Sequence, residues 1–432
     1  MSDTPSTTES SSAQGSRRGL KVLAPFRVRD FALYWTARTV SFLGDGVMYV
    51  ALPWQVYELV NSPKAMGVVG ALETGAILAF VLFGGVASDR FERKRVIIVS
   101  DLVRALAAGV VGVLAISGDL QLWHVAAMSV VFGLGQAFAG PAFGSIVPQL
   151  VPDDLLVPAN SALFTVNPLA MRFIGPALGG FVIAAFGTGA AFLVDAASFA
   201  AGAIAIAFVA ARPAARLLEE GDQRTVFEDI RESIRYVRAH VWLWGTLLWA
   251  LLVLPLAWGP YAVLVPYLVK NELGGDAQDL GLVFAAGGIS SVLMALVVSQ
   301  VGVPRRHIAF MYAMFGLGAV DLAIYAATQT PWQAMLVAFV TECGWTGGLV
   351  VWNTLVQKAV PSELLGRVRS VDWIASIGLV PLSFAVVGPI ADVVGVRPVM
   401  VACGVGGVLL SLAAFLLPGM RDTESQISLS GP

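Results

Sequence analysis

The chain has 432 residues, of which 57% are hydrophobic and 13% are charged, and its mean hydropathy is +0.78. This composition excludes an ordinary soluble domain, because a water-exposed surface needs a larger share of polar residues. The formal net charge of −2 is close to zero, so the placement of the charges is more informative than their sum.

Apolar runs of about 20 residues recur along almost the whole chain, and each is long enough to cross about 30 Å of hydrocarbon as a helix. The runs are continuous and lack the alternation of barrel strands, so helices must satisfy the backbone within the membrane. We therefore predict an all-α membrane protein with twelve transmembrane helices in two six-helix halves. The expected spans are 31–58, 66–88, 96–117, 123–147, 158–184, 189–210, 242–269, 278–302, 307–328, 333–357, 368–392 and 397–417.

Basic residues are divided unevenly between the two sets of loops. If both termini lie on one side, the segments on that side hold 21 of the 27 Lys and Arg residues, and the opposite loops hold three. The positive-inside rule then places both termini in the cytoplasm. We expect a multi-pass protein of the inner or plasma membrane, with residues 1–29 forming a disordered cytoplasmic tail.

Span one carries four polar residues along one face, at the spacing i, i+3, i+7 and i+11. They are Arg38, Ser41, Asp45 and Tyr49. Ionisable side chains are costly inside a membrane, so each indicates a functional site until a structural role is found. Two interpretations remain open: the stripe faces a cavity, or Arg38 and Asp45 only neutralise each other. Glu73 in span two is a further candidate.

The loop between spans two and three is the most specific segment, with the sequence Gly84-Gly-Val-Ala-Ser-Asp89-Arg90-Phe-Glu-Arg93-Lys94-Arg95. It resembles the cytoplasmic signature loop of the major facilitator superfamily. The resemblance implies a cytoplasmic gate, in which Asp89 pairs with Arg367 or Arg369 at the entry to span eleven. The expected gate residues are Gly85, Asp89, Arg90, Arg93, Lys94, Arg367 and Arg369. An ordinary positive-inside loop would explain the arginines but not the glycines or Asp89.

Span five contains Gly175-Pro176-Ala-Leu-Gly179-Gly180, which resembles the motif that drug:proton antiporters of this superfamily carry there. The proline removes a backbone hydrogen bond and the glycines thin the helix, so we expect a bend and close packing. A generic small-residue interface is the alternative. Arg172, just before the motif, is another candidate for the cavity.

Further segments narrow the resemblance to the branch that contains the enterobactin exporter and macrolide efflux proteins. They are Leu43-Gly-Asp45, Ala51-Leu-Pro-Trp-Gln55, Phe192-Leu-Val-Asp195, Ile234-Arg-Tyr-Val-Arg238 and Leu365-Gly-Arg367-Val-Arg369-Ser370. One departure is that span four has no arginine, which puts in doubt a proton mechanism that relies on that residue.

Other charged residues in spans are assigned structural roles. We expect Asp101 and Arg104, in span three, to belong to the charge network of the cytoplasmic loop. Asp195 and Asp321 lie on spans six and nine, which the family places at the periphery, so packing is favoured for both.

The longest polar interruption separates the two halves. Residues 212–241 form a linker in which a capping box at Thr225-Val-Phe-Glu228 precedes an apolar stripe, predicting an amphipathic cytoplasmic helix on the membrane surface. A partner-binding helix is the alternative. The expected halves are 30–211 and 242–418, followed by a cytoplasmic tail at 419–432. Val151–Leu156 matches Val360–Leu365 at an offset of 209 residues, which indicates an internal duplication.

Spans seven and ten complete the expected cavity. Span seven suits a kinked helix and an apolar binding wall, because it is rich in Trp and Pro. The residues are Trp249, Pro255, Trp258, Pro260 and Tyr261. On span ten, Glu342, Thr346, Asn353 and Gln357 share one face. The family's architecture implies that spans one, four, seven and ten line the cavity. The candidates for proton coupling and substrate contact are therefore Arg38, Asp45, Glu73, Arg172 and Glu342.

Several kinds of site are missing from the sequence. No lysine follows a glycine, which excludes a P-loop ATPase, and the three histidines stand apart, which argues against a metal site. Cys343 and Cys403 fall within spans, where free thiols pack as small apolar groups. We expect no cofactor and no enzymatic activity, since no nucleophile and base occur together.

These features predict a secondary active transporter that exports an amphiphilic, drug-like or siderophore-like small molecule by alternating access, coupled to protons. The expected partners are the small-molecule substrate, protons and the lipid bilayer, with no nucleic acid, and the chain is expected to be a monomer. The alternatives are an importer or facilitator with the same fold and a non-transporting membrane receptor or scaffold.

Overall fold

The computed structural model describes residues 23–210 and 235–426 of the chain, and every regular element in these two ranges is a helix. Residues 1–22 of the expected tail, the capping box at Thr225 and the last six residues lie outside the described residues, so the predictions about them stay predictions. Ala24–Arg27, placed in the disordered tail from the sequence, form a short helix. Of the linker, residues 235–239 are helical and Val237 is buried against the second half.

The first half comprises nine helical elements. They are η1 (Ala24–Arg27), α2 (Arg29–Leu59), α3 (Pro63–Arg90), α4 (Arg93–Ser117), α5 (Leu122–Leu150), η2 (Asp153–Leu155), α6 (Leu156–Asn167), η3 (Pro168–Ile174) and α7 (Gly175–Ala207). Local chemistry sets several ends: α3 begins with a proline, which needs no hydrogen bond at that position, and α4 ends at Gly118 with φ of 83°.

The second half repeats this pattern from residue 241 on. Its elements are α9 (Val241–Tyr267), η4 (Leu268–Glu272), α10 (Ala277–Val301), α11 (His307–Ala319), α12 (Asp321–Tyr325), α13 (Pro331–Ala359), α14 (Ser362–Ile377), α15 (Val380–Val394), α16 (Val396–Phe415) and α17 (Thr423–Gln426). At the start of α10, the Asp276 carboxylate accepts a hydrogen bond from the Asp279 backbone N–H at 2.9 Å, which caps the helix.

Ten helical segments in the described ranges are long and apolar enough to cross a membrane. One of them, Asp153–Ala207, is 55 residues long and bends at Gly187, where φ is 81°, so it provides two spans. Helix α2 is long enough to cross a membrane, with 31 residues, but polar side chains such as Asp45 and Gln55 lower its mean hydropathy, so it is not among the ten. With these two segments the arrangement is consistent with the predicted twelve spans, and the helix ends lie within a few residues of the expected positions.

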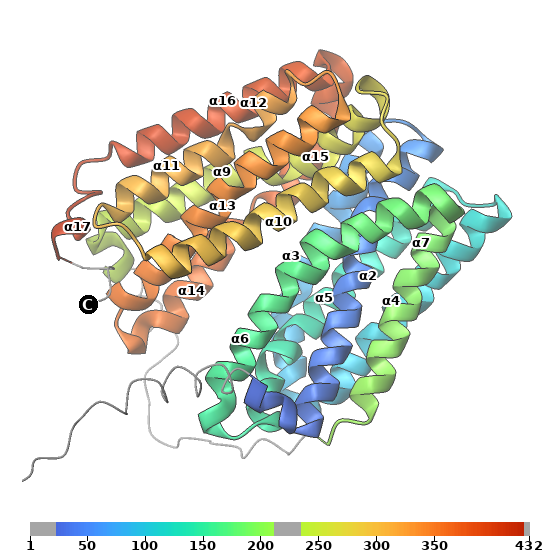
Figure 1. The fold of residues 1–432 in the computed structure, drawn as a ribbon, viewed down its shortest axis with the longest axis horizontal. Helices are drawn as coiled ribbons and strands as arrows, with labels where there is room; N and C mark the ends of the chain where they lie inside the picture. The colour runs from blue at the N-terminus through green and yellow to red at the C-terminus, as the bar shows by residue number, and fades with distance from the viewer. Residues whose placement is uncertain (1–22, 211–234, 427–432) are drawn as a thin grey trace, which may run out of the picture.

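The helices form two bundles, α2–α7 and α9–α16, which Figure 1 shows as two inclined arms. Within the first bundle α2 and α4 pack along α7, and α3 packs along α5. Within the second, α10 and α11 pack on α13, and α9 packs between α15 and α16. The arms touch mainly where α3 meets α15 and α7 meets α10.

The contacts between the arms gather on the side opposite the chain termini. There the Tyr57 hydroxyl donates to the Val263 carbonyl oxygen at 2.5 Å, and the Ser62 hydroxyl donates to the Asp392 carboxylate at 3.3 Å. Gly388 lies so close to Lys64 that an added Cβ would stand 2.6 Å from the Lys64 Cα atom. On the termini side, α6 and α14 lie on separate arms (Figure 1). The molecule is therefore closed on one side and open on the side of its termini.

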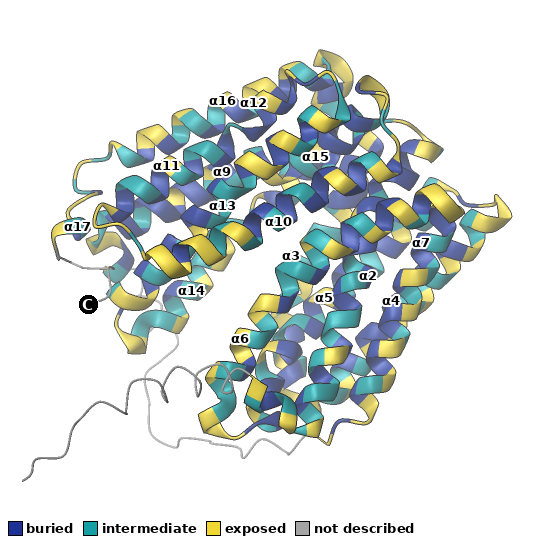
Figure 2. Ribbon diagram, in the orientation of Figure 1, coloured by how far each residue is buried: buried dark blue, intermediate teal, exposed yellow. Residues whose placement is uncertain are grey.

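Exposed residues on the outer helices are largely apolar, as expected of a surface in contact with lipid. Figure 2 shows exposed positions recurring along the outward side of α16. Five large exposed side chains there share one face: Val401, Val405, Leu409, Leu412 and Leu416. This pattern is the reverse of a soluble protein, in which such a stripe would face the core.

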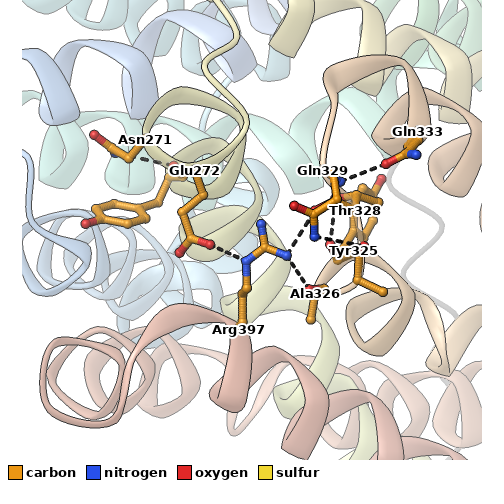
Figure 3. A network of polar contacts seen from close by, with 10 residues as sticks. Asn271, Glu272, Tyr325, Ala326, Thr328, Gln329, Gln333 and Arg397 are labelled. Atoms are coloured by element: carbon orange, nitrogen blue, oxygen red, sulfur yellow. Dashed lines mark hydrogen bonds and ion pairs between the residues drawn. The ribbon is translucent and has the colours of Figure 1, made fainter.

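Arg397 fastens the closed end of the second arm, as Figure 3 shows. Its Nε atom lies 2.5 Å from Glu272 Oε2, and its Nη1 atom donates to the carbonyl oxygens of Ala326 and Thr328 at 2.6 and 2.9 Å. One side chain thus joins η4, the turn after α12 and the start of α16. This arginine serves the structure of the C-terminal half.

Candidate functional site

A charged pair joins the two arms near the middle of the spans. Arg172 of η3 and Glu342 of α13 place Nη1 and Oε2 3.8 Å apart, with 53% and 17% of their side chains exposed. Oε2 of Glu342 is buried and has no hydrogen-bond partner in the described residues. The pair is therefore a loose electrostatic contact whose carboxylate can still accept a hydrogen bond or a cation.

Aromatic side chains from four helices form a chain of rings near this pair. The Tyr49 ring of α2 lies 4.8 Å from Phe284 of α10, and Phe284 lies 5.7 Å from Tyr261 of α9. Tyr261 in turn lies 6.2 Å from Tyr325 of α12. Tyr49 is 41% exposed, so the chain of rings has an accessible end. Ring faces beside an ion pair suit an amphiphilic molecule with an apolar body and a charged group.

Local backbone features bring the charged pair together. Arg172 lies in η3, a π-helical turn that begins at Pro168, where a proline cannot continue the regular hydrogen bonds. Gly288 of α10 lies against the Arg172 backbone, where a Cβ would overlap the Arg172 carbonyl oxygen. A Cβ at Gly287 would stand 2.8 Å from Cγ of Glu342. These two glycines let α10 fit between the two charged residues.

Asp101 and Arg104 form a buried ion pair inside the first arm, with 1% and 4% of their side chains exposed. The guanidinium carbon of Arg104 lies 4.2 Å from the centre of the Phe199 ring. The expectation that both residues join the charge network of the loop is therefore wrong. Both residues lie two or three turns after the start of α4, where this helix packs against α7.

Arg38, Asp45 and Glu73 lie around this buried pair. Arg38 packs its guanidinium 4.1 Å from the Phe42 ring and 3.7 Å from the Phe143 ring, and no ion pair to Asp45 forms within the described chain. The charge of Asp45 interacts with those of Arg104 and Arg38, and the charge of Glu73 interacts with those of Asp45 and Arg104. Simple mutual neutralisation of Arg38 and Asp45 does not describe this arrangement. The predicted cavity residues thus divide between two places.

The signature loop ties α4 to its own arm. Arg93 donates to the Ser145 carbonyl oxygen at 2.6 Å, and Lys94 donates to the carbonyl oxygens of Ala207 and Val209, both at 2.7 Å. Asp89 and Arg90 are exposed. These bonds hold the loop against the ends of α5 and α7.

Within the described ranges Asp89 forms no ion pair with Arg367 or Arg369 of α14, so the expected latch is not formed in this conformation. Arg369 instead donates to Asn353 Oδ1 at 2.6 Å and lies 3.6 Å from Asp372, both in its own arm. The physical reason is that the arms are apart on this side. Of the loop glycines, Gly84 makes the close approach, because a Cβ there would overlap the Ala137 carbonyl, whereas a Cβ at Gly85 would meet nothing within 4 Å.

The span-five motif lies where α7 crosses two other helices. An added Cβ at Gly179 would stand 2.9 Å from the Val47 carbonyl oxygen of α2, and one at Gly175 would stand 2.7 Å from the Gly46 Cα atom. Gly180 faces the other arm, with a Cβ position 2.7 Å from the Ala277 carbonyl oxygen of α10. Pro176 opens α7 directly after the π-helical turn. The motif therefore packs both within its arm and between the arms.

Trp249 lies elsewhere than the sequence indicated, whereas Asp321 is buried, in agreement with its predicted packing role. Trp249 stacks on Phe315 at 4.2 Å and donates to the Ser411 hydroxyl at 2.8 Å, so it fills the interior of the second arm and forms no binding wall. Asp321 accepts a hydrogen bond from the Leu322 backbone N–H at 2.5 Å. Tyr261 belongs to the segment of span seven that the sequence indicated as a binding wall, whereas Phe284 was not singled out, since no local pattern links separate helices.

Comparison with known proteins identifies a family of membrane proteins and relatives that are named as efflux proteins. A family model described as "Transmembrane secretion effector" matches residues 20–430. Multidrug efflux pump Tap of Mycolicibacterium fortuitum is 29% identical over 400 residues, covering 88% of this chain and 94% of that protein. Macrolide efflux protein A of Streptococcus pyogenes is 22% identical over 407 residues, covering 91% and 96%.

Two solved structures share the fold. The nucleoside transporter NupG superposes with a TM-score of 0.66 at 14% identity, covering 92% of this chain and 100% of that one. A bacterial homologue of the human lysosomal transporter Spinster, in an inward-facing and unoccupied conformation, superposes with a TM-score of 0.70 at 14% identity, covering 93% and 98%. At these identities the likeness concerns the fold alone.

Proposed function

Because the chain belongs to the transmembrane secretion effector family of the major facilitator superfamily, whose members are transporters and not enzymes, we propose that it exports amphiphilic small molecules by proton-coupled alternating access. The observation that carries the proposal is the Arg172–Glu342 pair, which joins the arms beside a chain of aromatic rings. Relatives that are named as multidrug and macrolide efflux proteins support drug-like substrates.

The orientation in the membrane follows from the basic residues. The termini side carries most of the Lys and Arg side chains, so we place both termini in the cytoplasm. The open side of the molecule then faces the cytoplasm, from which a substrate for export enters. The moving bodies are the two halves, residues 30–211 and 242–418.

The cycle requires the cytoplasmic side to close after the substrate has entered. We assign this closure to the signature loop. As the arms approach, the exposed Asp89 carboxylate would form an ion pair with Arg367 or Arg369. The charge pair at the centre would respond to the same motion, because Arg172 and Glu342 are carried by different arms. A substrate cation or a proton on Glu342 would release Arg172 and allow the arms to separate on the outer side.

Protons supply the driving force in this proposal, through Asp45 or Glu342. A charge that crosses the membrane gains about 2.3 kcal/mol per 100 mV, to which the pH gradient adds. This is enough to concentrate a substrate about 50-fold for each 100 mV, since about 1.4 kcal/mol corresponds to a factor of ten.

The test is transport in proteoliposomes with an imposed pH gradient, with ethidium and a radiolabelled macrolide as probes. We expect Asp45→Asn and Glu342→Gln each to abolish gradient-driven flux, and Asp119→Asn, in an exposed loop on the opposite side, to leave it unchanged. Full coupling in both variants would exclude these carboxylates as proton carriers. Flux only toward the cytoplasmic side would indicate an importer, and no flux with bound probe would indicate a receptor.

A further inference from the structure

Asp195 of α7 is buried without a partner. None of its side chain is exposed, and neither carboxylate oxygen has a hydrogen-bond partner in the described part of the chain. The nearby Ser198 hydroxyl donates to the Asp195 backbone carbonyl at 2.8 Å, and it lies beside the carboxylate at Gly44. Oδ1 points at α2, where an added Cβ on Gly44 would lie only 2.6 Å from it.

Charged groups from two other helices interact with this carboxylate. They are Asp45 of α2 and Asp101 and Arg104 of α4, which in turn interact with Arg38 of α2 and Glu73 of α3. From α5, Gly135 packs against Arg104, whose Cδ atom would lie 2.7 Å from an added Cβ. Four carboxyl groups and two guanidinium groups thus belong to one electrostatic network in this arm, in which Asp45 and Glu73 are half-buried.

Neither guanidinium neutralises Asp195 directly. Arg104 is bound to Asp101, and Arg38 lies between two phenyl rings. Nε of Arg104 is buried and has no partner among the described atoms, so the site has an unused donor as well as an unused carboxylate. An ionised carboxylate in such surroundings is strongly unfavourable, whereas the neutral acid is tolerated.

We propose that Asp195 carries the coupling proton, at a site inside the N-terminal half that is separate from the Arg172–Glu342 substrate site. The proposal rests on the proton-coupled export described above and assigns its proton to a residue of span six. Asp195 is the neutral acid in the cytoplasm-open state. Its O–H bond breaks as an O–H bond forms on Asp45, and the negative charge left on Asp195 then faces Arg104.

Two features favour a proton over a metal cation. No group of three or more Asp, Glu, His or Cys side chains that could hold a metal ion occurs among the described residues. Asp45 also provides a path by which the proton can leave. It is half-buried and lies one helical turn from Tyr49, whose ring is exposed at the substrate site. The same stripe of α2 thus connects the two sites.

The direct test is infrared difference spectroscopy of the full chain in lipid nanodiscs, following the carbonyl stretch of a protonated carboxylic acid as pH is raised. We expect a band that disappears with rising pH, that is absent in Asp195→Asn, and that remains in the matched control Asp321→Asn, another buried aspartate within a span. Persistence of the whole titrating band in Asp195→Asn would overturn the proposal. So would loss of the band on adding Na⁺ at constant pH, which would indicate a cation site.

A second variant covers the case in which Asp195→Asn does not fold. Arg104→Lys keeps the positive charge but replaces the planar guanidinium by an ammonium group on a shorter side chain, farther from Asp195. We expect the pH at which the band disappears to rise by about one unit. An unchanged midpoint would show that Arg104 does not act on the titrating group, and the assignment to this site would fail.

Ethidium flux separates this inference from the proposed function. If the wild-type protein shows flux driven by a pH gradient and Asp195→Asn loses the gradient dependence while still binding ethidium, both proposals stand. If Asp195→Asn keeps full coupling, the assignment to Asp195 falls and proton-coupled export remains. If the wild-type protein shows no gradient-driven flux, the proposed function fails, whatever the infrared band does.

Discussion

Single charged residues in this membrane protein have very different roles depending on the depth at which they lie. Asp101 and Arg104 are almost wholly buried, whereas Arg95 and Glu92 form a pair at 2.8 Å with 81% and 49% of their side chains exposed. Burial removes the water that would screen a charge, so the loss of one partner costs more stability in the first pair than in the second.

Replacing Asp101 by Asn should destabilise the protein by about 3 kcal/mol, because the Arg104 charge would lose its buried partner. The matched control Glu92→Gln removes one partner of the exposed pair and should cost about 1 kcal/mol or less. Both changes can be measured as shifts in unfolding by SDS from mixed micelles. Equal effects of the two substitutions would contradict the distinction by depth.

Replacing the two members of the Arg172–Glu342 pair should change ligand binding in opposite directions. Glu342→Gln should weaken the binding of ethidium, a cation, about tenfold, whereas Arg172→Gln should strengthen it, because the Glu342 carboxylate is then free to receive the ligand. Fluorescence anisotropy with the purified protein measures both. Weaker binding in both variants would show that the pair acts only as a structural link.

At the scale of helices, close packing between the arms depends on glycines. Gly281 of α10 meets the motif of span five, where an added Cβ would stand 2.5 Å from the Pro176 carbonyl oxygen and 2.9 Å from the Gly180 Cα atom. Backbone atoms cannot move aside as a flexible side chain can, so a methyl group at this position must push α7 and α10 apart.

Gly281→Ala should therefore open the outer contact between the arms. Cysteines at positions 62 and 392, introduced into a chain in which Cys343 and Cys403 are replaced by Ser, report this contact through the yield of crosslinking. We expect a clear fall in yield for Gly281→Ala and no change for Gly316→Ala, since a Cβ at Gly316 would meet nothing within 4 Å. An unchanged yield in both variants would mean that α7 and α10 accommodate the added methyl group without moving the arms apart.

For the whole molecule, alternating access requires the outer contact to break in every cycle. Linking Ser62→Cys to Asp392→Cys with a short bifunctional thiosulfonate reagent should stop ethidium export, and dithiothreitol should restore it, because these positions lie on different arms and their native side chains are 3.3 Å apart. The control is the same reagent on Ser117→Cys and Asp119→Cys, whose native side chains are 2.9 Å apart in one exposed turn of the first arm. Continued export by the linked Ser62–Asp392 protein would exclude separation of the arms at this point.

The sequence by itself determined the fold class, the spans and the positions of the motifs. These features depend on local quantities: the length of an apolar run, the sign of a loop's charge, and a short spacing such as that from Gly84 to Arg95. The cost of charge in hydrocarbon also singled out Asp45, Arg172 and Glu342 before their surroundings were known.

Only the tertiary structure decided which of these charged residues meet. Most of the spans are apolar on all sides, so their sequences do not distinguish the face toward a neighbouring helix from the face toward lipid. Asp195 was assigned to packing and Asp101 to a loop network for this reason, although both lie in one buried cluster with Arg104. The contact of Arg172 with Glu342 spans 170 residues of chain and depends on how the two arms lean together, which no local pattern encodes.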